Sequence, residues 1–203
     1  MRITSDEMVF VHNITQGEQV FGFNIRFLHN KNEDVIQGLI KKGILESEER
    51  LSQDAYYLIK AIEDYKNSSK HIILNSLHLA PLKNGDMVMI YPIENDYEVG
   101  IVNNMVIWYF LIKKYEFLRG KKEVIGKQMN QSGLDDVIPE LYQNENNIII
   151  GEFIDKVAIR EYVFYYKDGK NIKYDFASGK KFLSDGYEMR IELGTLLGLQ
   201  KGF

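Results

Sequence analysis

The sequence contains no cysteine and only three prolines among its 203 residues. Without cysteine the chain forms no disulfide, no thiolate nucleophile and no cysteine-based zinc site. No stretch rich in proline, glycine and serine marks a flexible linker between domains. We therefore expect a single α+β domain over residues 1–203, with loose halves at about 1–120 and 121–203.

Long apolar runs are also absent. The longest run, Met105 to Ile112, is far shorter than the roughly 18–20 residues needed to cross a bilayer. The opening MRITSDEMVFVHNI carries acidic residues where a signal peptide needs a basic start and an apolar core. We therefore expect a cytoplasmic protein with no membrane insertion.

Motifs for phosphate binding and catalysis are missing, because GxxxxGK[ST], GxGxxG and GxSxG do not occur. The histidines are His12, His29, His71 and His78, and no HExxH-type pair exists. If His71 and His78 share one strand, their odd spacing places them on opposite faces. We expect no catalytic residue, no metal and no cofactor.

The net charge of −4 provides no general attraction to nucleic acid or to anionic membranes. One segment, residues 113–127, departs from this balance, since cations outnumber its carboxylates. Its charged residues are Lys113, Lys114, Arg119, Lys121, Lys122 and Lys127 against Glu116 and Glu123. A solvated turn or helix face is the ordinary interpretation, and a phosphate-binding strip is the alternative.

Capping signals and periodicity predict three helices early in the chain. Thr4 and Glu7 have the spacing of a capping box, so a helix begins there. A second helix, over about 32–42, ends at Gly43, which suits the left-handed C-terminal position. A third helix follows Ser52 as its N-cap.

Short polar connections then separate runs of apolar and β-branched residues, which is typical of antiparallel meanders. The expected strands are His71–Leu79, Met87–Ile93, Tyr97–Val102, Val106–Leu111, Asn147–Phe153 and Ala158–Tyr166. For Val106–Leu111 a helix running toward Arg119 is an open alternative. The turn Asp168-Gly169 predicts a two-residue hairpin. Further helices are expected at Leu134–Tyr142 and Met189–Leu199. This order favours an α+β fold with a central antiparallel sheet flanked by helices.

Residues 87–92 are apolar on both strand faces. A strand covered on both sides by its own fold explains this pattern. The alternative is that the methionine and tyrosine face meets a partner, because methionine adapts its shape and tyrosine adds a polar tip. The candidate partner-binding residues are therefore Met87, Met89 and Tyr91, with Tyr97 of the next strand extending the same face.

Several features of element order and helix endings occur along most of the chain. They are the Thr4-Ser5-Asp6-Glu7 helix start, the helix ending at 39–45, the Leu51-Ser52 helix start, the passage into sheet at Lys70–Leu79 and the hairpin VFYYKDGKNIKYDFASGK. In these features the chain resembles the EspG-like accessory proteins of type VII (ESX) secretion, including the Gram-positive branch of that family.

This resemblance implies an α+β fold with a central antiparallel sheet, surrounding helices and pseudo-two-fold halves. It implies a cytosolic chaperone or adaptor that binds helical secretion substrates, such as WXG100-like or LXG-type proteins, and keeps them soluble for export. It implies no catalysis, metal or nucleotide, so we expect a protein that is not an enzyme.

A winged-helix-type DNA-binding regulator is the main alternative. LIKKGIL followed by ERLSQDAYYLIKAI has the helix–turn–helix rhythm of such domains. The helix after Ser52, however, offers only Lys60 and Lys66, and carboxylates outnumber them. An enzyme with a dispersed site and a structural subunit of a larger assembly are further alternatives. We expect no nucleic-acid partner.

Overall fold

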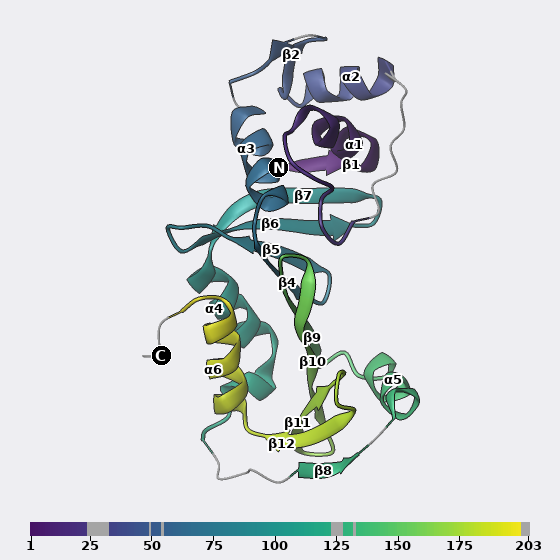
Figure 1. Ribbon diagram of the computed structural model, residues 1–203, viewed down its shortest axis with the longest axis vertical. Helices are drawn as coiled ribbons and strands as arrows, with labels where there is room; N and C mark the ends of the chain where they lie inside the picture. Colours follow the sequence, from purple (N-terminus) through teal and green to yellow (C-terminus); the bar gives the residue numbers. More distant parts are fainter. Residues whose placement is uncertain (24–32, 49, 54, 123–127, 132, 200–203) are drawn as a thin grey trace. The chain divides into compact units, whose positions relative to one another are not determined.

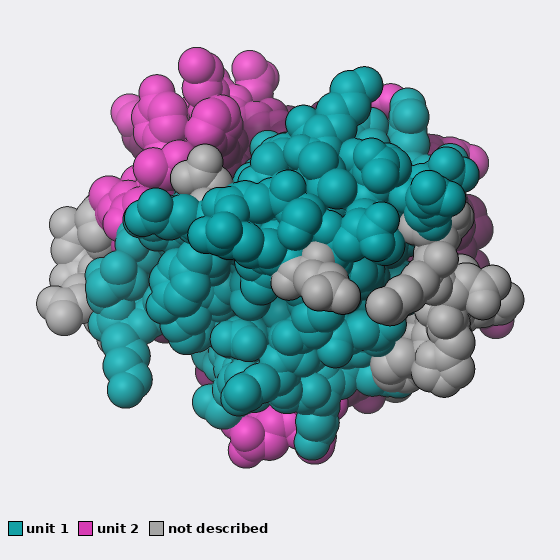
Figure 2. All heavy atoms as spheres, turned by 90° about the horizontal axis from the view of Figure 1, so that it is seen from above, with its two compact units in different colours: residues 1–71, 76–102 teal, residues 72–75, 103–203 magenta. Residues whose placement is uncertain are grey.

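The computed structural model describes residues 1–23, 33–48, 50–53, 55–122, 128–131 and 133–199 (Figure 1). The chain divides into two compact units (Figure 2). Unit 1 comprises Met1–His71 and Ser76–Val102, and unit 2 comprises Ile72–Asn75 and Asn103–Phe203. The division after Val102 falls earlier than the loose boundary expected near residue 120, and the single domain over 1–203 stays a prediction.

Unit 1 combines a small antiparallel sheet with three helices. Its strands follow the order β1-β7-β6-β5, and β1 with β7 and β5 with β6 are antiparallel pairs. A separate pair of short strands, β2 and β3, is also antiparallel. The elements are β1 (Arg2–Thr4), α1 (Ser5–Ile14), α2 (Glu33–Lys41), β2 (Leu45–Ser47), β3 (Arg50–Leu51), α3 (Ala55–Lys66), β5 (Leu77–Pro81), β6 (Asp86–Ile93) and β7 (Asp96–Asn103).

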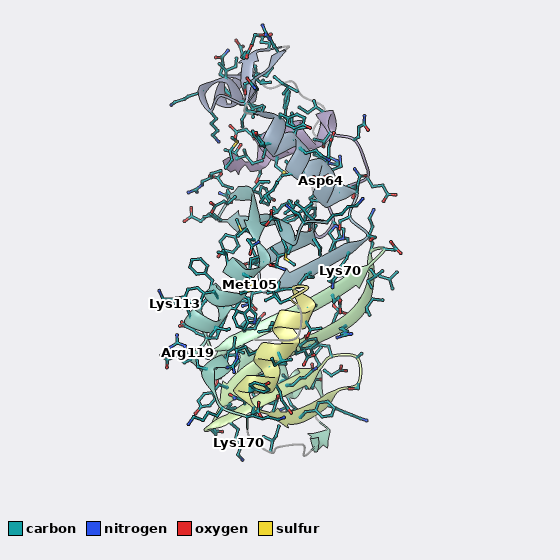
Figure 3. All side chains as sticks on the ribbon, turned by 90° about the vertical axis from the view of Figure 1, so that its left-hand side faces the viewer. Asp64, Lys70, Met105, Lys113, Arg119 and Lys170 are labelled. Carbon is teal, nitrogen blue, oxygen red and sulfur yellow. The ribbon has the colours of Figure 1, made fainter. Side chains whose placement is uncertain are left out.

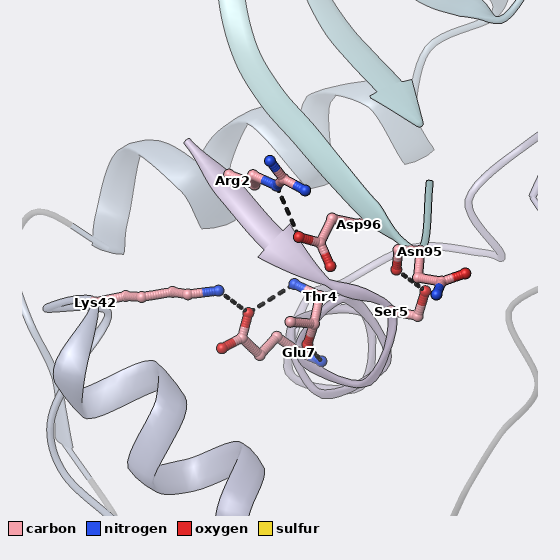
Figure 4. Close-up of polar contacts among 7 residues, drawn as sticks. All are labelled: Arg2, Thr4, Ser5, Glu7, Lys42, Asn95 and Asp96. Atoms are coloured by element: carbon pink, nitrogen blue, oxygen red, sulfur yellow. Dashed lines mark hydrogen bonds and ion pairs between the residues drawn. The ribbon is translucent and has the colours of Figure 1, made fainter. Parts of the chain in front are cut away.

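The predicted capping box is present at the start of α1 (Figure 4). The Thr4 amide donates to the Glu7 carboxylate at 2.7 Å, and the Glu7 amide donates to the Thr4 hydroxyl at 3.2 Å. The same carboxylate forms an ion pair of 2.5 Å with Lys42, just beyond α2. One buried glutamate therefore fixes the start of α1 and the end of α2 together.

Gly43 ends α2 as the sequence predicts, with a φ of +70°. The Gly43 amide donates to the carbonyl of Ile40 at 2.9 Å, and the Ile44 amide donates to that of Leu39 at 2.8 Å. These two bonds form the Schellman ending, which satisfies carbonyls that the helix leaves free. The predicted N-cap Ser52 is also confirmed, because its hydroxyl accepts from the Ala55 amide at 3.0 Å.

Unit 2 contains an antiparallel set of strands in the order β9-β10-β11-β12-β8. Strand β4 (Lys70–Leu74) begins in unit 1 and ends in unit 2, where the Asn75 amide donates to the carbonyl of Ile149 at 2.8 Å. The other elements are α4 (Asn104–Lys114), the 3₁₀ helix η1 (Glu116–Arg119), β8 (Gln128–Gln131), α5 (Leu134–Tyr142), β9 (Asn147–Ile154), β10 (Val157–Lys167), β11 (Lys170–Asp175), β12 (Lys180–Ser184) and α6 (Gly186–Leu196).

Two predicted strands differ from the structure. Residues 71–79 form two strands, not one, because the chain turns at Asn75, which has a φ of +54°. Residues 106–111 belong to helix α4, so the helical alternative is the correct one. Asn103 begins this helix by accepting a hydrogen bond of 3.0 Å from the Met105 amide. The α+β class and the antiparallel sheet are as predicted.

Candidate partner-binding surface

The three candidate residues on β6 differ widely in exposure. Met87 is buried, Met89 is half-buried, and Tyr91 exposes 39% of its surface. The residues between them, Val88 and Ile90, belong to the core of unit 1. Only the C-terminal end of the methionine and tyrosine face therefore presents apolar surface to solvent.

Tyr97 lies on the opposite face of the sheet from the methionines. It is paired with Ile3 of β1, and its ring meets Phe23 edge-on at a centroid distance of 5.4 Å. Ile3 and Tyr97 pack in the same core cluster as Val88 and Ile90. The structure therefore does not bring Tyr97 together with the methionine and tyrosine face that it was expected to extend.

Two histidines of unit 1, His71 and His78, lie in an aromatic cluster. His71 and His78 lie on different strands, β4 and β5, and not on one strand as the sequence analysis considered. The His71 ring lies 4.8 Å from Tyr65, and the His78 ring lies 4.2 Å from Phe23. Burial lowers the pKa of His78 to about 4, and neighbouring His71 adds to this effect. Both rings are therefore neutral core residues near pH 7.

Among the described residues, no three histidine, aspartate or glutamate side chains gather in a way that would hold a metal ion. His29 lies outside the described residues. His12 is buried at the end of α1, where burial and the charge of Lys66 lower its pKa.

Lys66 is a buried lysine, a residue type that often serves as a catalytic base or nucleophile. Its ammonium donates to the carbonyls of His12 and Thr15 at 3.2 and 3.0 Å and to the Thr15 hydroxyl at 3.0 Å. These acceptors match the three donors of an ammonium. Burial lowers the pKa of Lys66, and Glu63 opposes this shift. Lys66 therefore joins the end of α3 to the end of α1.

Unit 2 also contains a polar cluster that joins separate elements, and this cluster forms around Glu140 of α5. Its carboxylate lies 3.0 Å from the Lys167 amine and 3.2 Å from that of Lys181, and it accepts from the Tyr165 hydroxyl at 3.1 Å. Burial alone would raise the pKa of Glu140, but the hydrogen bonds from these lysines outweigh it and lower the pKa. This glutamate fixes α5 to β10 and β12.

Helix α4 is attached to α6 by its inner side. The Asn104 side chain donates to the carbonyl of Leu197 at 3.1 Å, and the Trp108 indole donates to that of Arg190 at 3.3 Å. Gly194 permits close packing, since an added Cβ there would lie 3.3 Å from the indole nitrogen. These contacts fix the rotation of α4 about its axis and thereby determine which side chains face outward.

The outer side of α4 is apolar and exposed. Tyr109 and Phe110 expose 59% and 64% of their surfaces, and Met105 and Val106 one turn earlier are also exposed. Residues spaced by four lie on the same helix face. The four side chains therefore form one stripe, which we call the α4 face. The α4 face was not expected from the sequence, because residues 106–111 were predicted as a strand. A strand has no outer helix face.

The pattern that defines DUF5081, a domain of unknown function, matches residues 2–176. The chain belongs to the DUF5081 family. A comparison with curated proteins finds no match. The matched region runs from β1 to the end of β11 and includes α4, so the α4 face lies inside the DUF5081 domain. The family description assigns no activity, and the resemblance to EspG-like proteins stays a hypothesis.

None of the helices in the described part of this DUF5081 protein is long and apolar enough to cross a membrane. The exposed apolar residues of α4 belong to a helix of 11 residues, between Asn104 and Lys114. A spanning helix needs about 20 residues.

Proposed function

We propose that this DUF5081 protein is a cytoplasmic chaperone or adaptor that binds helical substrate proteins of a type VII secretion system and keeps them soluble for export. The observation that carries the proposal is the α4 face, in which four large apolar side chains are exposed on one rigidly held helix. Contiguous exposed apolar residues are a feature of protein-binding surfaces. The resemblance to EspG-like proteins supplies the class of partner.

The spacing of the α4 face suits a helical partner. Met105 and Tyr109 form one row of side chains along the helix, and Val106 and Phe110 form a parallel row. A partner helix packs its own side chains into the groove between such rows. Tyrosine and phenylalanine bury large areas and offer only two side-chain torsions to be fixed, which makes them effective anchors.

A role without catalysis is part of this proposal. Buried Lys66 and half-buried Glu140 resemble catalytic groups, but each is engaged by several partners that connect secondary-structure elements. Their hydrogen bonds are accounted for by the fold alone. This supports a binding protein over an enzyme with a dispersed site.

The geometry of α3 favours the adaptor over the DNA-binding alternative. Lys66 is buried, and Lys60 pairs with Asp64 on the same helix. Within Ala55–Lys66, therefore, neither lysine is left to meet a phosphate without giving up an existing partner. Recognition helices usually present several cations to the DNA backbone.

The proposal predicts that Tyr109→Ser/Phe110→Ser abolishes capture of the partner. We expect tagged wild-type protein, retrieved from its native cytosol, to carry a WXG100-like or LXG-type protein in near-stoichiometric amount. The double variant is expected to lose at least about 30-fold in affinity, because a central anchor contributes about 2 kcal/mol or more. Binding is measured by titration with the purified partner identified by mass spectrometry.

The matched control is Tyr56→Ser/Tyr57→Ser, which removes two adjacent aromatic side chains that are 63% and 72% exposed on α3. Both double variants change surface residues and should retain the wild-type circular dichroism spectrum. Recovery of the wild-type protein alone would count against the adaptor function. Equal losses in the two double variants would show that the α4 face is not the binding surface.

A further inference from the structure

Basic residues follow the α4 face in the chain, and the first of them lies on the same side of the helix. Lys113 follows Tyr109 by four residues and Phe110 by three, so it lies on the same side of the helix. Figure 3 shows Lys113 and Arg119 near one edge of the ribbon. We define the basic strip as the exposed lysines Lys113, Lys114, Lys121 and Lys122.

The charge of this region is opposite to that of the whole chain. Between residues 105 and 122 five cations stand against one carboxylate, although the chain has a net charge of −4. That carboxylate, Glu116, forms its ion pair with Arg119 at 3.9 Å. Among the described residues no carboxylate pairs with a lysine of the basic strip. Glu123 and Lys127, from the segment noted in the sequence, lie outside the described residues.

Stability of the fold accounts for only part of this charge. Lys113 and Lys114 lie in the last turn of α4, where the helix dipole favours cations. Arg119 donates to the carbonyls of Ile112 and Lys113, so it caps the helix. Lys121 and Lys122 follow η1, beyond the last turn of α4, where the dipole effect has decayed. The Lys122 amine lies 5.9 Å from the centroid of the Tyr187 ring, so this contact accounts for part of its placement.

The geometry points to a partner helix that is acidic, and we infer that its carboxylates meet the basic strip while its apolar residues meet the α4 face. This inference rests on the proposed function. Apolar anchors followed by cations on the same helix side are complementary to an amphipathic helix with glutamate or aspartate one turn beyond its apolar stripe. Such charge pairing selects the partner and its direction of binding more than it adds affinity.

A pair of synthetic helical peptides tests this inference. Both carry the same leucine stripe, and they differ only in having glutamate or lysine next to it. We expect the wild-type chain to bind the glutamate peptide about tenfold more tightly at low salt, with the preference shrinking as salt screens the charges. Lys113→Glu/Lys114→Glu is expected to reverse the preference. Fluorescence anisotropy of the labelled peptides reports both affinities.

The matched control is Lys41→Glu/Lys83→Glu, which changes the net charge equally at two exposed lysines of unit 1. It should keep the wild-type preference. Equal affinity of the wild-type chain for both peptides would overturn the acidic-partner inference and leave docking at the α4 face standing. Failure of both peptides to bind would count against the α4 face itself. A third outcome would also overturn the inference. The chain would bind neither peptide but would sediment with phosphatidylglycerol vesicles, and Lys113→Glu/Lys114→Glu would abolish that sedimentation.

Discussion

Replacing Gly186 with alanine is expected to lower the free energy of unfolding by about 3 kcal/mol. Gly186 begins α6, and a Cβ added there would lie 2.1 Å from the carbonyl oxygen of Phe117 and 2.8 Å from the amide nitrogen of Gly120. Both are backbone atoms, so relief requires η1 and α6 to move apart. Urea denaturation followed by circular dichroism measures the loss.

The control for this prediction is Gly100→Ala, because nothing lies within 4 Å of a Cβ added at Gly100. Its effect should stay within about 0.5 kcal/mol. A Gly186→Ala protein as stable as the wild type would show that the η1–α6 packing is loose. The packing matters for the proposed binding because η1 connects α4 to Lys121 and Lys122, and a shift of η1 would displace these two lysines.

Acidification is expected to destabilise the chain between pH 6.5 and about 4. His78 has an ordinary pKa of 6.5 when exposed, and burial lowers its pKa to about 4 in the folded chain. Above pH 6.5 the ring is neutral in both the folded and the unfolded chain, so its ionisation does not change the free energy of unfolding. As the pH falls toward 4, the unfolded chain binds a proton that the folded chain excludes. Stability therefore decreases by about 1.4 kcal/mol per pH unit, or about 3 kcal/mol in total.

The variant His78→Phe isolates this contribution. It replaces the imidazole with another ring that stacks on Phe23 and cannot be protonated. Between pH 6.5 and 4, the slope of its free energy of unfolding against pH should be smaller than that of the wild type by about 1.4 kcal/mol per pH unit. This difference corresponds to one bound proton. Burial lowers the pKa values of His71 and His12 as well, so a residual slope of the same sign should persist. An unchanged slope would show that groups other than His78 cause the acid sensitivity.

Elements set by local interactions were predictable from the sequence. The capping box at Thr4 forms because its donors and acceptors lie within four residues of each other. Gly43, Asp168 and Gly169 adopt positive φ where the sequence placed a helix end and a hairpin turn. Helix α5 begins and ends at the predicted residues, Leu134 and Tyr142.

The missed elements depend on partners distant in sequence. The run Val106–Leu111 is apolar on both sides, so periodicity does not separate strand from helix. The choice of a helix is supported by Asn103 as its cap and by α6, which covers Asn104 and Trp108. Strand β12 was not predicted either, because Lys180–Ser184 shows no alternation of apolar and polar residues. This segment is a strand because it pairs with β11.

The prediction of the candidate site was also limited, because exposure depends on contacts between residues distant in sequence. The sequence indicates that Met87–Pro92 is a strand apolar on both faces, and this strand exists as β6. Which face is covered depends on the rest of the fold, and Met87 is buried. Conversely, Tyr109 and Phe110 look like core residues in the sequence, and only the attachment of α4 to α6 turns them outward.

The central claim is that the α4 face binds a helical secretion substrate, and site-specific photo-crosslinking tests it most directly. Benzoylphenylalanine is placed at Tyr109 in one protein and at Tyr57, exposed on α3, in another. After irradiation in native cells, the account predicts one main adduct from position 109, with a small helical secretion substrate, and none from position 57. No adduct at position 109, or the same adduct in equal yield from both positions, would contradict the account.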